Sequence, residues 1–317
     1  MEVTVPSLAK INLDLRVLYK RNDGYHELRS LFQTISLKDT LNIRFETARR
    51  SEFSLDSSVD IPDNLVLRAA RLVSEELNIK ARMRFRLRKN IPMGAGLGGG
   101  SSNAAAVLIA LPALAGKRIP IGRLLGWAES LGSDVPFFLL GGTAVGIGRG
   151  TELYPLEDQP RRHVLVVSTG VHVSTRDAYK RLEREPVTPS VTSTLTSPVD
   201  LPILREFQTI AWTLDRSDLR QIPFANDFEK PVFETHGEIP VVVRKLRRAG
   251  ARPVLMTGSG SAVFATFETA AQAKSAAQMF PPGSAFPSRF VDRRQYRNLW
   301  TRALGSFAGA CCFATPE

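Results

Sequence analysis

The chain of 317 residues is poor in cysteine, since only Cys311 and Cys312 occur and they are adjacent, near the C-terminus. Two neighbouring cysteines cannot supply the disulfide framework that holds many small secreted domains together. Free thiols suit a reducing compartment. The cysteine content therefore predicts a cytoplasmic protein.

Long hydrophobic runs are also missing. The longest apolar stretch, 104–115, is interrupted by Pro112 and is shorter than the roughly 20 residues that span a bilayer. No basic segment followed by an apolar one opens the chain. The hydrophobic content of 43% is ordinary for a globular protein, so we expect a soluble chain with no membrane partner.

Acidic residues are scarce relative to basic ones, with 31 Asp and Glu against 42 Lys and Arg and a net charge of +11. Such a charge favours nucleic-acid binding, but no zinc-ligand spacing or RNA-reading motif accompanies it. The arginines at 82–88 alternate with apolar residues, as on a half-buried strand with one solvated face. We therefore predict no nucleic-acid partner, while the same positive field would attract small polyanionic substrates.

The length exceeds that of a typical single core and predicts two domains. Pro160 and the charges around it interrupt the hydrophobic pattern and mark a boundary. We expect an N-terminal domain at 1–158, a C-terminal α+β domain at 159–295 and a tail of uncertain structure at 296–317. The segment 185–198 is rich in Pro, Ser and Thr and is typical of an exposed loop. The protein is expected to be a monomer or a homodimer.

The richest local signal is a glycine cluster, with five glycines among the seven residues 94–100. Two serines, Asn103 and an alanine-rich apolar run follow, as at the start of a helix. A glycine loop that leads into a helix N-terminus offers unpaired N–H groups and a partial positive charge to phosphate oxygens. The segment therefore predicts a phosphate-binding loop.

Other glycine patterns fit less well. A Walker A loop needs a lysine after the glycines, and a protein kinase needs H-R-D and D-F-G segments, all of which are missing. Gly94, Gly96 and Gly99 do match the dinucleotide pattern G-x-G-x-x-G. That pattern expects a carboxylate roughly 20 residues later, whereas the first one here is Glu129. A ligand-free turn would need only one or two glycines.

Three segments in order along the chain resemble the motifs of the GHMP kinases, the superfamily of galactokinase, homoserine kinase and mevalonate kinase. They are P-S-L-A-K-I-N-L-D-L at 6–15, P-M-G-A-G-L-G-G-G-S-S-N-A-A-A at 92–106 and L-M-T-G-S-G-S-A-V-F at 255–264. The resemblance implies an ATP-dependent kinase that phosphorylates an alcohol. It also implies a two-domain α+β GHMP kinase fold with the active site in the interdomain cleft.

Two residues become catalytic candidates through this resemblance. Strand alternation places Lys10 and Asn12 on one face, which by itself fits a solvated strand equally well. Asp134 opens an apolar segment, where a carboxylate is most often an N-cap. In several members of the superfamily, a lysine of the first motif and the aspartate of a G-x-D-V-P segment flank the acceptor hydroxyl. The resemblance therefore assigns proton acceptance to Asp134 and charge stabilisation to Lys10.

Further segments are similar to a branch of the superfamily that phosphorylates an alcohol carried on cytidine diphosphate, in the non-mevalonate route to isoprenoids. They are A-K-I-N-L at 9–13, R-N-D-G-Y-H-E-L-R-S-L-F at 21–32, D-N-L-V at 63–66, G-S-D-V-P-F-F at 132–138 and N-D-F-E at 226–229. This resemblance implies a cytosine ring between Tyr25 and Tyr179, with His26 on its polar edge. Without it, Tyr25 and His26 fit a polar turn. The substrate-binding residues implied are Asn12, Tyr25, His26, Thr175, Tyr179, Gly258, Ser259 and Gly260.

The same resemblance implies ATP as the phosphate donor and Mg²⁺ bridging its phosphates. Ser101 or Ser102 is expected to touch the magnesium, and no acidic ligand can be assigned from the sequence. The ATP-binding residues implied are Asn64, Lys89, Pro92, Gly94, Gly96, Leu97, Gly98, Gly99, Gly100, Ser101, Ser102 and Asn103.

Three alternatives remain from the sequence. One is a GHMP kinase that phosphorylates a different alcohol, and another is a non-catalytic binding protein on the same fold. The third is a basic nucleic-acid binder, which would show salt-sensitive affinity for DNA or RNA.

Overall fold

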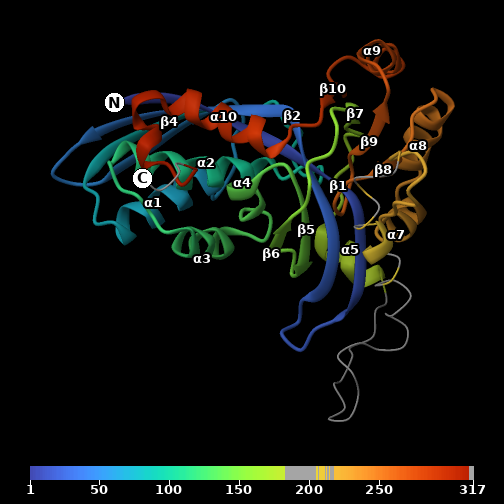
Figure 1. Ribbon diagram of the computed structural model, residues 1–317, viewed down its shortest axis with the longest axis horizontal. Helices are drawn as coiled ribbons and strands as arrows, with labels where there is room; N and C mark the ends of the chain where they lie inside the picture. The colour runs from blue at the N-terminus through green and yellow to red at the C-terminus, as the bar shows by residue number, and fades with distance from the viewer. Residues whose placement is uncertain (183–204, 206, 211, 213, 215–217, 314–317) are drawn as a thin grey trace.

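The computed structural model describes residues 1–182, 205, 207–210, 212, 214 and 218–313 (Figure 1). The predicted loop at 185–198 lies outside these residues. None of the helices in the described ranges is long and apolar enough to cross a membrane.

The N-terminal unit is built on a mixed sheet of order β3-β4-β2-β5-β6, in which β1 also pairs with β2. Its strands are β1 (Glu2–Lys20), β2 (His26–Thr47), β3 (Glu52–Ser57), β4 (Ala81–Arg88), β5 (Thr143–Gly148) and β6 (Glu152–Pro155). Only β3 and β4 are parallel neighbours. Figure 1 shows the long antiparallel β1–β2 pair leaving the sheet and ending in a hairpin beside α5.

Strand β1 carries the first motif and departs from simple alternation. Its pairing with β2 shifts between Leu8 and Ala9 and again between Asn12 and Asp14. Every residue from 7 to 18 is buried, because the second unit covers the face that an isolated sheet would expose to water. Lys10 is only 3% exposed and Asn12 only 2%, so the reading of these two residues as a solvated face is wrong.

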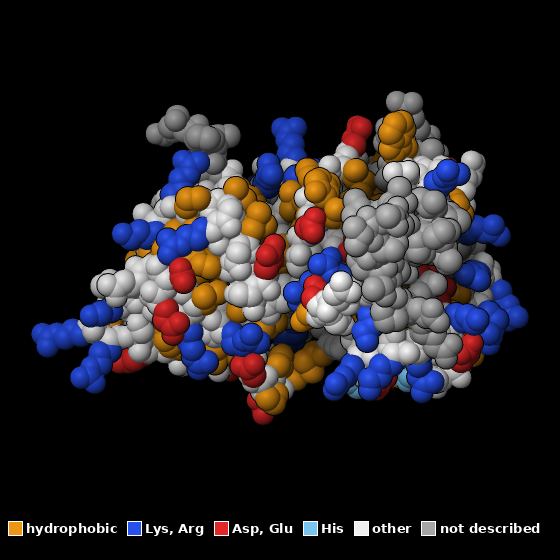
Figure 2. All heavy atoms as spheres, turned by 90° about the horizontal axis from the view of Figure 1, so that it is seen from below, with side chains coloured by type: hydrophobic (Ala, Val, Ile, Leu, Met, Phe, Trp, Pro, Cys, Tyr) orange, Lys and Arg blue, Asp and Glu red, His pale blue; other side chains and the backbone are white. Residues whose placement is uncertain are grey.

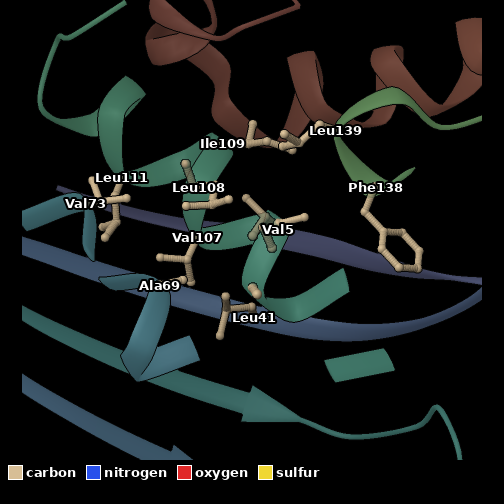
Figure 3. Close-up of a cluster of buried hydrophobic side chains, with 14 of the residues drawn as sticks. Val5, Leu41, Ala69, Val73, Val107, Leu108, Ile109, Leu111, Phe138 and Leu139 are labelled. Carbon is tan, nitrogen blue, oxygen red and sulfur yellow. The ribbon is translucent and has the colours of Figure 1, made fainter. Parts of the chain in front are cut away.

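Helices cover one face of this sheet and form the largest core. They are α1 (Leu65–Glu76), α2 (Gly99–Leu114), α3 (Ile121–Leu131) and α4 (Phe137–Leu140). Helix α2 is apolar on all sides and buried from residue 102 to its end, as expected of a central helix. Figure 3 shows its side chains between those of α1 and the sheet residues Val5 and Leu41. The phosphate loop therefore leads into the most enclosed helix of the unit.

The C-terminal unit has a second, antiparallel sheet of order β10-β7-β9-β8. Its strands are β7 (His163–Val167), β8 (Val254–Met256), β9 (Val263–Phe267) and β10 (Ala285–Arg289), and its helices are α5 (Thr175–Arg181), α7 (Glu229–Thr235), α8 (Glu238–Arg248) and α9 (Ala270–Ala277). Its first strand, β7, begins five residues after the boundary predicted at residue 158.

The C-terminal segment returns to the N-terminal unit. Helix α10 (Arg293–Leu304) is followed by the short 3-10 helix η1 (Gly305–Ala310). The predicted boundary at 295 thus falls inside α10, which begins at the N-cap Asp292. Tyr296, Trp300 and Leu304 recur every four residues and are fully buried in the core that contains α2. The residues predicted as a tail are part of the N-terminal unit, because these large side chains complete its core.

Charged side chains are spread over the surface. On the face in Figure 2, lysines and arginines lie on both halves of the molecule, with aspartates and glutamates among them. Two arginines of β4 pair with carboxylates of β3, Arg82 with Glu52 and Arg86 with Asp56. The excess positive charge is therefore not gathered into one stripe on this face.

Candidate active site

The phosphate loop has the backbone that its sequence predicts. Gly94, Gly96 and Gly98 all have positive φ, of 62°, 75° and 69°, and Gly98 is the N-cap of α2. The Ser102 N–H donates a hydrogen bond to the Gly98 carbonyl, with 2.8 Å between nitrogen and oxygen. The earlier N–H groups of a helix have no acceptor within it, so this end is suited to an anion.

Two of these glycines also have no room for a side chain. An added Cβ at Gly96 would overlap the Thr257 carbonyl, and one at Gly98 would come 2.8 Å from the ring of Phe138. The first contact is with the third motif and the second is with α4. The loop is therefore fixed between the two units by close backbone packing.

Asn12 and Lys10 together join the three motifs. Its Oδ1 accepts hydrogen bonds from Lys10 Nζ at 2.8 Å and from the Gly258 N–H at 3.0 Å, and its Nδ2 donates to Ser30 at 2.7 Å. The Lys10 N–H donates in turn to the Leu97 carbonyl at 3.0 Å. The amide of Asn12 thus orients the lysine and holds the Gly258–Gly260 loop against β1.

Lys10 and Asp134 come together between the units. Lys10 Nζ lies 3.4 Å from Asp134 Oδ2, although 124 residues separate the two in the chain. The side chain of Asp134 is 33% exposed while that of Lys10 is 4% exposed, so the carboxylate faces the open side. A buried cation beside a reachable carboxylate can orient a hydroxyl, lower its pKa and accept its proton.

Lys89 and Asn103 form a second buried network, centred on Asp39. The Asp39 carboxylate accepts from Lys89 Nζ, from Asn103 Nδ2 at 3.0 Å and from the N–H groups of Asn90 and Ile91 at 2.8 and 2.9 Å. Asn103 Oδ1 also accepts from Lys89. Asp39 thereby ties the entry of the phosphate loop to the second turn of α2.

Asn64 is the N-cap of α1, where its Oδ1 accepts from the Val66 N–H at 3.0 Å. It also lines a hollow of about 380 Å³. A neighbouring hollow of about 640 Å³ is lined by Lys89, Pro92 and Met93 together with residues of the second unit. Val59 lines both hollows, so the two adjoin each other.

The residues implied for cytidine gather in one place, which we call the outer hollow. It has a volume of about 980 Å³ and is lined by Tyr25, His26, Thr175 and Tyr179, among others. The ring of His26 stacks on that of Tyr179, with centroids 4.7 Å apart. Burial, and to a lesser degree the charge of Lys20, lower the pKa of His26 and favour its neutral form.

A second cavity of about 510 Å³, the inner hollow, contains the two predicted catalytic residues. Lys10, Asn12, Asp134, Gly94 and Gly96 line it, together with Gly258, Ser259 and Gly260 of the third motif. Ser259 is tied to Thr175 of α5 by a hydrogen bond of 2.8 Å between their hydroxyls. Sequence reasoning missed Arg149 and His172, which line it as well. Arg149 stands between two glycines at a hairpin tip. These glycines were the only feature of the local sequence that could have singled it out.

Comparison with known proteins agrees with this geometry. The family models for the N-terminal and C-terminal domains of GHMP kinases match residues 64–142 and 211–281. A 4-diphosphocytidyl-2-C-methyl-D-erythritol kinase from Solibacter usitatus is 48% identical over 299 residues, covering 94% of this chain and 92% of that protein. The chain belongs to this family of GHMP kinases.

Other relatives support the assignment. The Thermotoga maritima member of the family is 41% identical, over 82% of this chain and 90% of its own. A crystal structure of a 4-(cytidine 5'-diphospho)-2C-methyl-D-erythritol kinase superposes with a TM-score of 0.72 at 36% identity, covering 92% of this chain and 99% of that one. A homoserine kinase from Cytophaga hutchinsonii, at 18% identity and a TM-score of 0.69, shares the fold. The predicted superfamily, its cytidine diphosphate branch and the α+β fold are confirmed.

This GHMP kinase offers little to bind a metal by protein ligands alone. Within the described ranges, no group of three His, Cys, Asp or Glu side chains is placed to hold a metal ion. Ser102 Oγ, however, is buried in the first turn of α2 and has no hydrogen-bond partner. An unsatisfied hydroxyl at a phosphate loop fits an oxygen ligand to magnesium.

Proposed function

We propose that this GHMP kinase transfers the γ-phosphoryl group of ATP to the C2 hydroxyl of 4-diphosphocytidyl-2-C-methyl-D-erythritol, in non-mevalonate isoprenoid precursor biosynthesis. The observation that carries the proposal is the Lys10–Asp134 pair, which lies between the phosphate loop and the outer hollow. The family names of its relatives supply the acceptor.

The step assigned to the pair accounts for the proton, the phosphoryl group and the leaving group. Asp134 accepts the proton of the acceptor hydroxyl as the oxygen attacks the γ-phosphorus, and the bond from that phosphorus to the β-phosphate oxygen breaks to release ADP. Lys10, oriented by Asn12, stabilises the negative charge on the attacking oxygen and on the transferred group. Close placement of the two substrates contributes most of the remaining rate enhancement.

On the donor side, the N–H groups of Gly99, Gly100 and Ser101 would bind phosphate oxygens at the positive end of α2. Magnesium held by the ATP phosphates and the Ser102 hydroxyl would neutralise charge on them. The adjoining hollows near Asn64 and Pro92 would hold the base and ribose. Lys89 and Asn103 support this wall through Asp39.

On the acceptor side, Tyr25, His26, Thr175 and Tyr179 would hold the cytidine in the outer hollow, whose volume suits a ligand of this size. The Gly258–Gly260 loop would close over the substrate diphosphate. We further propose a cytoplasmic enzyme, monomeric or homodimeric, whose partner is this small molecule.

The test is ADP release from Mg-ATP with four acceptors: the cytidine diphosphate compound, mevalonate, homoserine and galactose. The proposal predicts turnover with the cytidine compound alone. Turnover with another alcohol would keep the kinase reaction and overturn the acceptor. ATP binding without turnover on any acceptor would overturn the catalytic role of the Lys10–Asp134 pair for these substrates.

A further inference from the structure

Arg149 stands at the tip of the β5–β6 hairpin and points into the cleft. Gly148 and Gly150 on either side of it have positive φ, of 66° and 87°, and the Gly150 N–H donates to the Ile147 carbonyl at 2.9 Å to close the turn. The guanidinium lies 3.5 Å from the ring centroid of Tyr25. Stacking on an aromatic face fixes its position without using its N–H donors.

The hairpin that carries Arg149 is itself fixed to the core of the N-terminal unit. An added Cβ at Gly146 would overlap the ring of Phe32, which also lies 5.5 Å from Lys10 Nζ. The turn therefore has a defined position relative to the catalytic lysine.

Arg149 belongs to both hollows. The outer and inner hollows share five lining residues, and Arg149 is the only charged one among them. Lys10 lines the inner hollow but not the outer one and is paired with Asp134. Arg176 and Lys180 line the outer hollow but not the inner one. Among the described residues, no carboxylate lies within 4.0 Å of the Arg149 guanidinium, although it attracts Asp23 at longer range.

We propose that Arg149 binds the diphosphate that links the cytidine to the reacting alcohol. This inference rests on the proposed function, because a ligand with its base in the outer hollow and its hydroxyl at Asp134 has its diphosphate where the two hollows join. A guanidinium donates two parallel hydrogen bonds to phosphate oxygens and keeps its charge at any physiological pH. Tyr25 then acts as the support that aims the guanidinium.

The test measures the dissociation constants of cytidine, CMP and CDP by calorimetry, for the whole protein and for its Arg149→Gln and Arg149→Lys variants. A charged hydrogen bond to phosphate predicts that Arg149→Gln weakens CDP binding about 10- to 100-fold and leaves cytidine binding unchanged. Arg149→Lys keeps the charge without the planar fork, so its affinity for CDP is expected to lie between those of the unaltered protein and Arg149→Gln. The KM of the cytidine acceptor should rise in parallel with the dissociation constant of CDP, while the KM of ATP does not change.

Arg176→Gln is the matched control, since Arg176 carries the same charge and lines the outer hollow only. Its effect on CDP binding should be much smaller than that of Arg149→Gln. Equal losses for cytidine and CDP in Arg149→Gln would show that Arg149 acts on the nucleoside through Tyr25, and would overturn the inference. Unchanged CDP binding would also overturn it. If the unaltered protein bound no cytidine and did not turn over the cytidine acceptor, the proposed function itself would fail.

Discussion

On the proposed donor side of the cleft, the groups available to phosphates are backbone N–H groups of residues 94–102, in a loop whose Gly96 and Gly98 have no space for a side chain. On the acceptor side, the corresponding groups are side chains from four separate segments: the β1–β2 hairpin, the β5–β6 turn, the segment at Asp134 and helix α5. Under the proposed function, the donor side would bind a feature common to all nucleoside triphosphates, whereas the acceptor side would distinguish one alcohol from another.

The two sides are therefore expected to respond differently to mutation. A backbone site fails when its conformation is disturbed, and such a change also lowers stability. A side-chain site loses one interaction at a time, so the affinity for one substrate changes while the fold persists. The Lys10–Asp134 pair lies between the two sides and, under the proposed function, would act on both substrates.

The largest effect is expected from Asp134→Asn, which keeps the size of the side chain and removes the base. We expect kcat to fall about 10²–10⁴-fold, since this is the usual contribution of a general base. Rapid-mix measurement of ADP formation gives the rate, while ATP affinity and melting temperature should stay as in the unaltered protein. Near-normal turnover by a folded variant would remove Asp134 from that role.

Gly96→Ala tests the donor side. The added methyl group overlaps the Thr257 carbonyl at a residue with positive φ, so the free energy of unfolding should fall by about 2–5 kcal/mol. Gly100→Ala is the control in the same loop, because its nearest neighbour would be Leu65 Cδ1 at 3.6 Å. A helical Gly-to-Ala change there should raise stability by up to about 1 kcal/mol. Similar denaturation midpoints for both variants would contradict the packing described for the loop.

Tyr296→Phe tests whether the C-terminal helix supports the donor side. The Tyr296 hydroxyl donates to the Phe138 carbonyl at 2.6 Å, and the Phe138 ring lies beneath Gly98. Loss of the hydroxyl leaves a buried carbonyl without its donor and should lower the free energy of unfolding by about 1–3 kcal/mol. Tyr154→Phe, at an exposed tyrosine of the same unit, should leave the urea midpoint unchanged. Equal midpoints for the two variants would show that the buried bond contributes nothing.

The smallest effect is expected on the acceptor side, from Tyr25→Ala. The Tyr25 ring supports Arg149 and was predicted to stack on cytosine. Its loss should raise the KM of the cytidine acceptor roughly 10-fold. The KM of ATP should not change, and Tyr25→Phe should behave as the unaltered protein. A parallel rise in both KM values would mean that the two sides are not independent.

The parts of this site that the sequence predicted best are local in the chain. The glycine loop and the helix after it depend on neighbouring residues alone, and the structure has both, although α2 begins at Gly99, ahead of the serines where the pattern places its start. The burial of Lys10 depends on a second unit that covers β1, so strand alternation could not reveal it. The roles of Asn12 and Asn103 inside the protein likewise depend on partners that are distant in sequence, such as Gly258 and Asp39.

Helix α10 shows the same limit. Its apolar residues at 296, 300 and 304 form a helical stripe that was present in the sequence, but nothing local indicates which core they enter. The predicted cytosine sandwich of Tyr25 and Tyr179 stays a prediction. In the structure, His26 stacks on Tyr179 and Arg149 stacks on Tyr25, which no residue spacing would have indicated.

The most direct test of the account is the position of the new phosphate. The cytidine acceptor is incubated with Mg-ATP and the unaltered protein, and the product is examined by ³¹P and ¹³C NMR. The account predicts one new phosphomonoester signal, equal in amount to the ADP formed and coupled to C2 of the erythritol. A phosphate on any other hydroxyl, or ADP formed without a phosphorylated alcohol, would contradict the placement of that hydroxyl between Lys10 and Asp134.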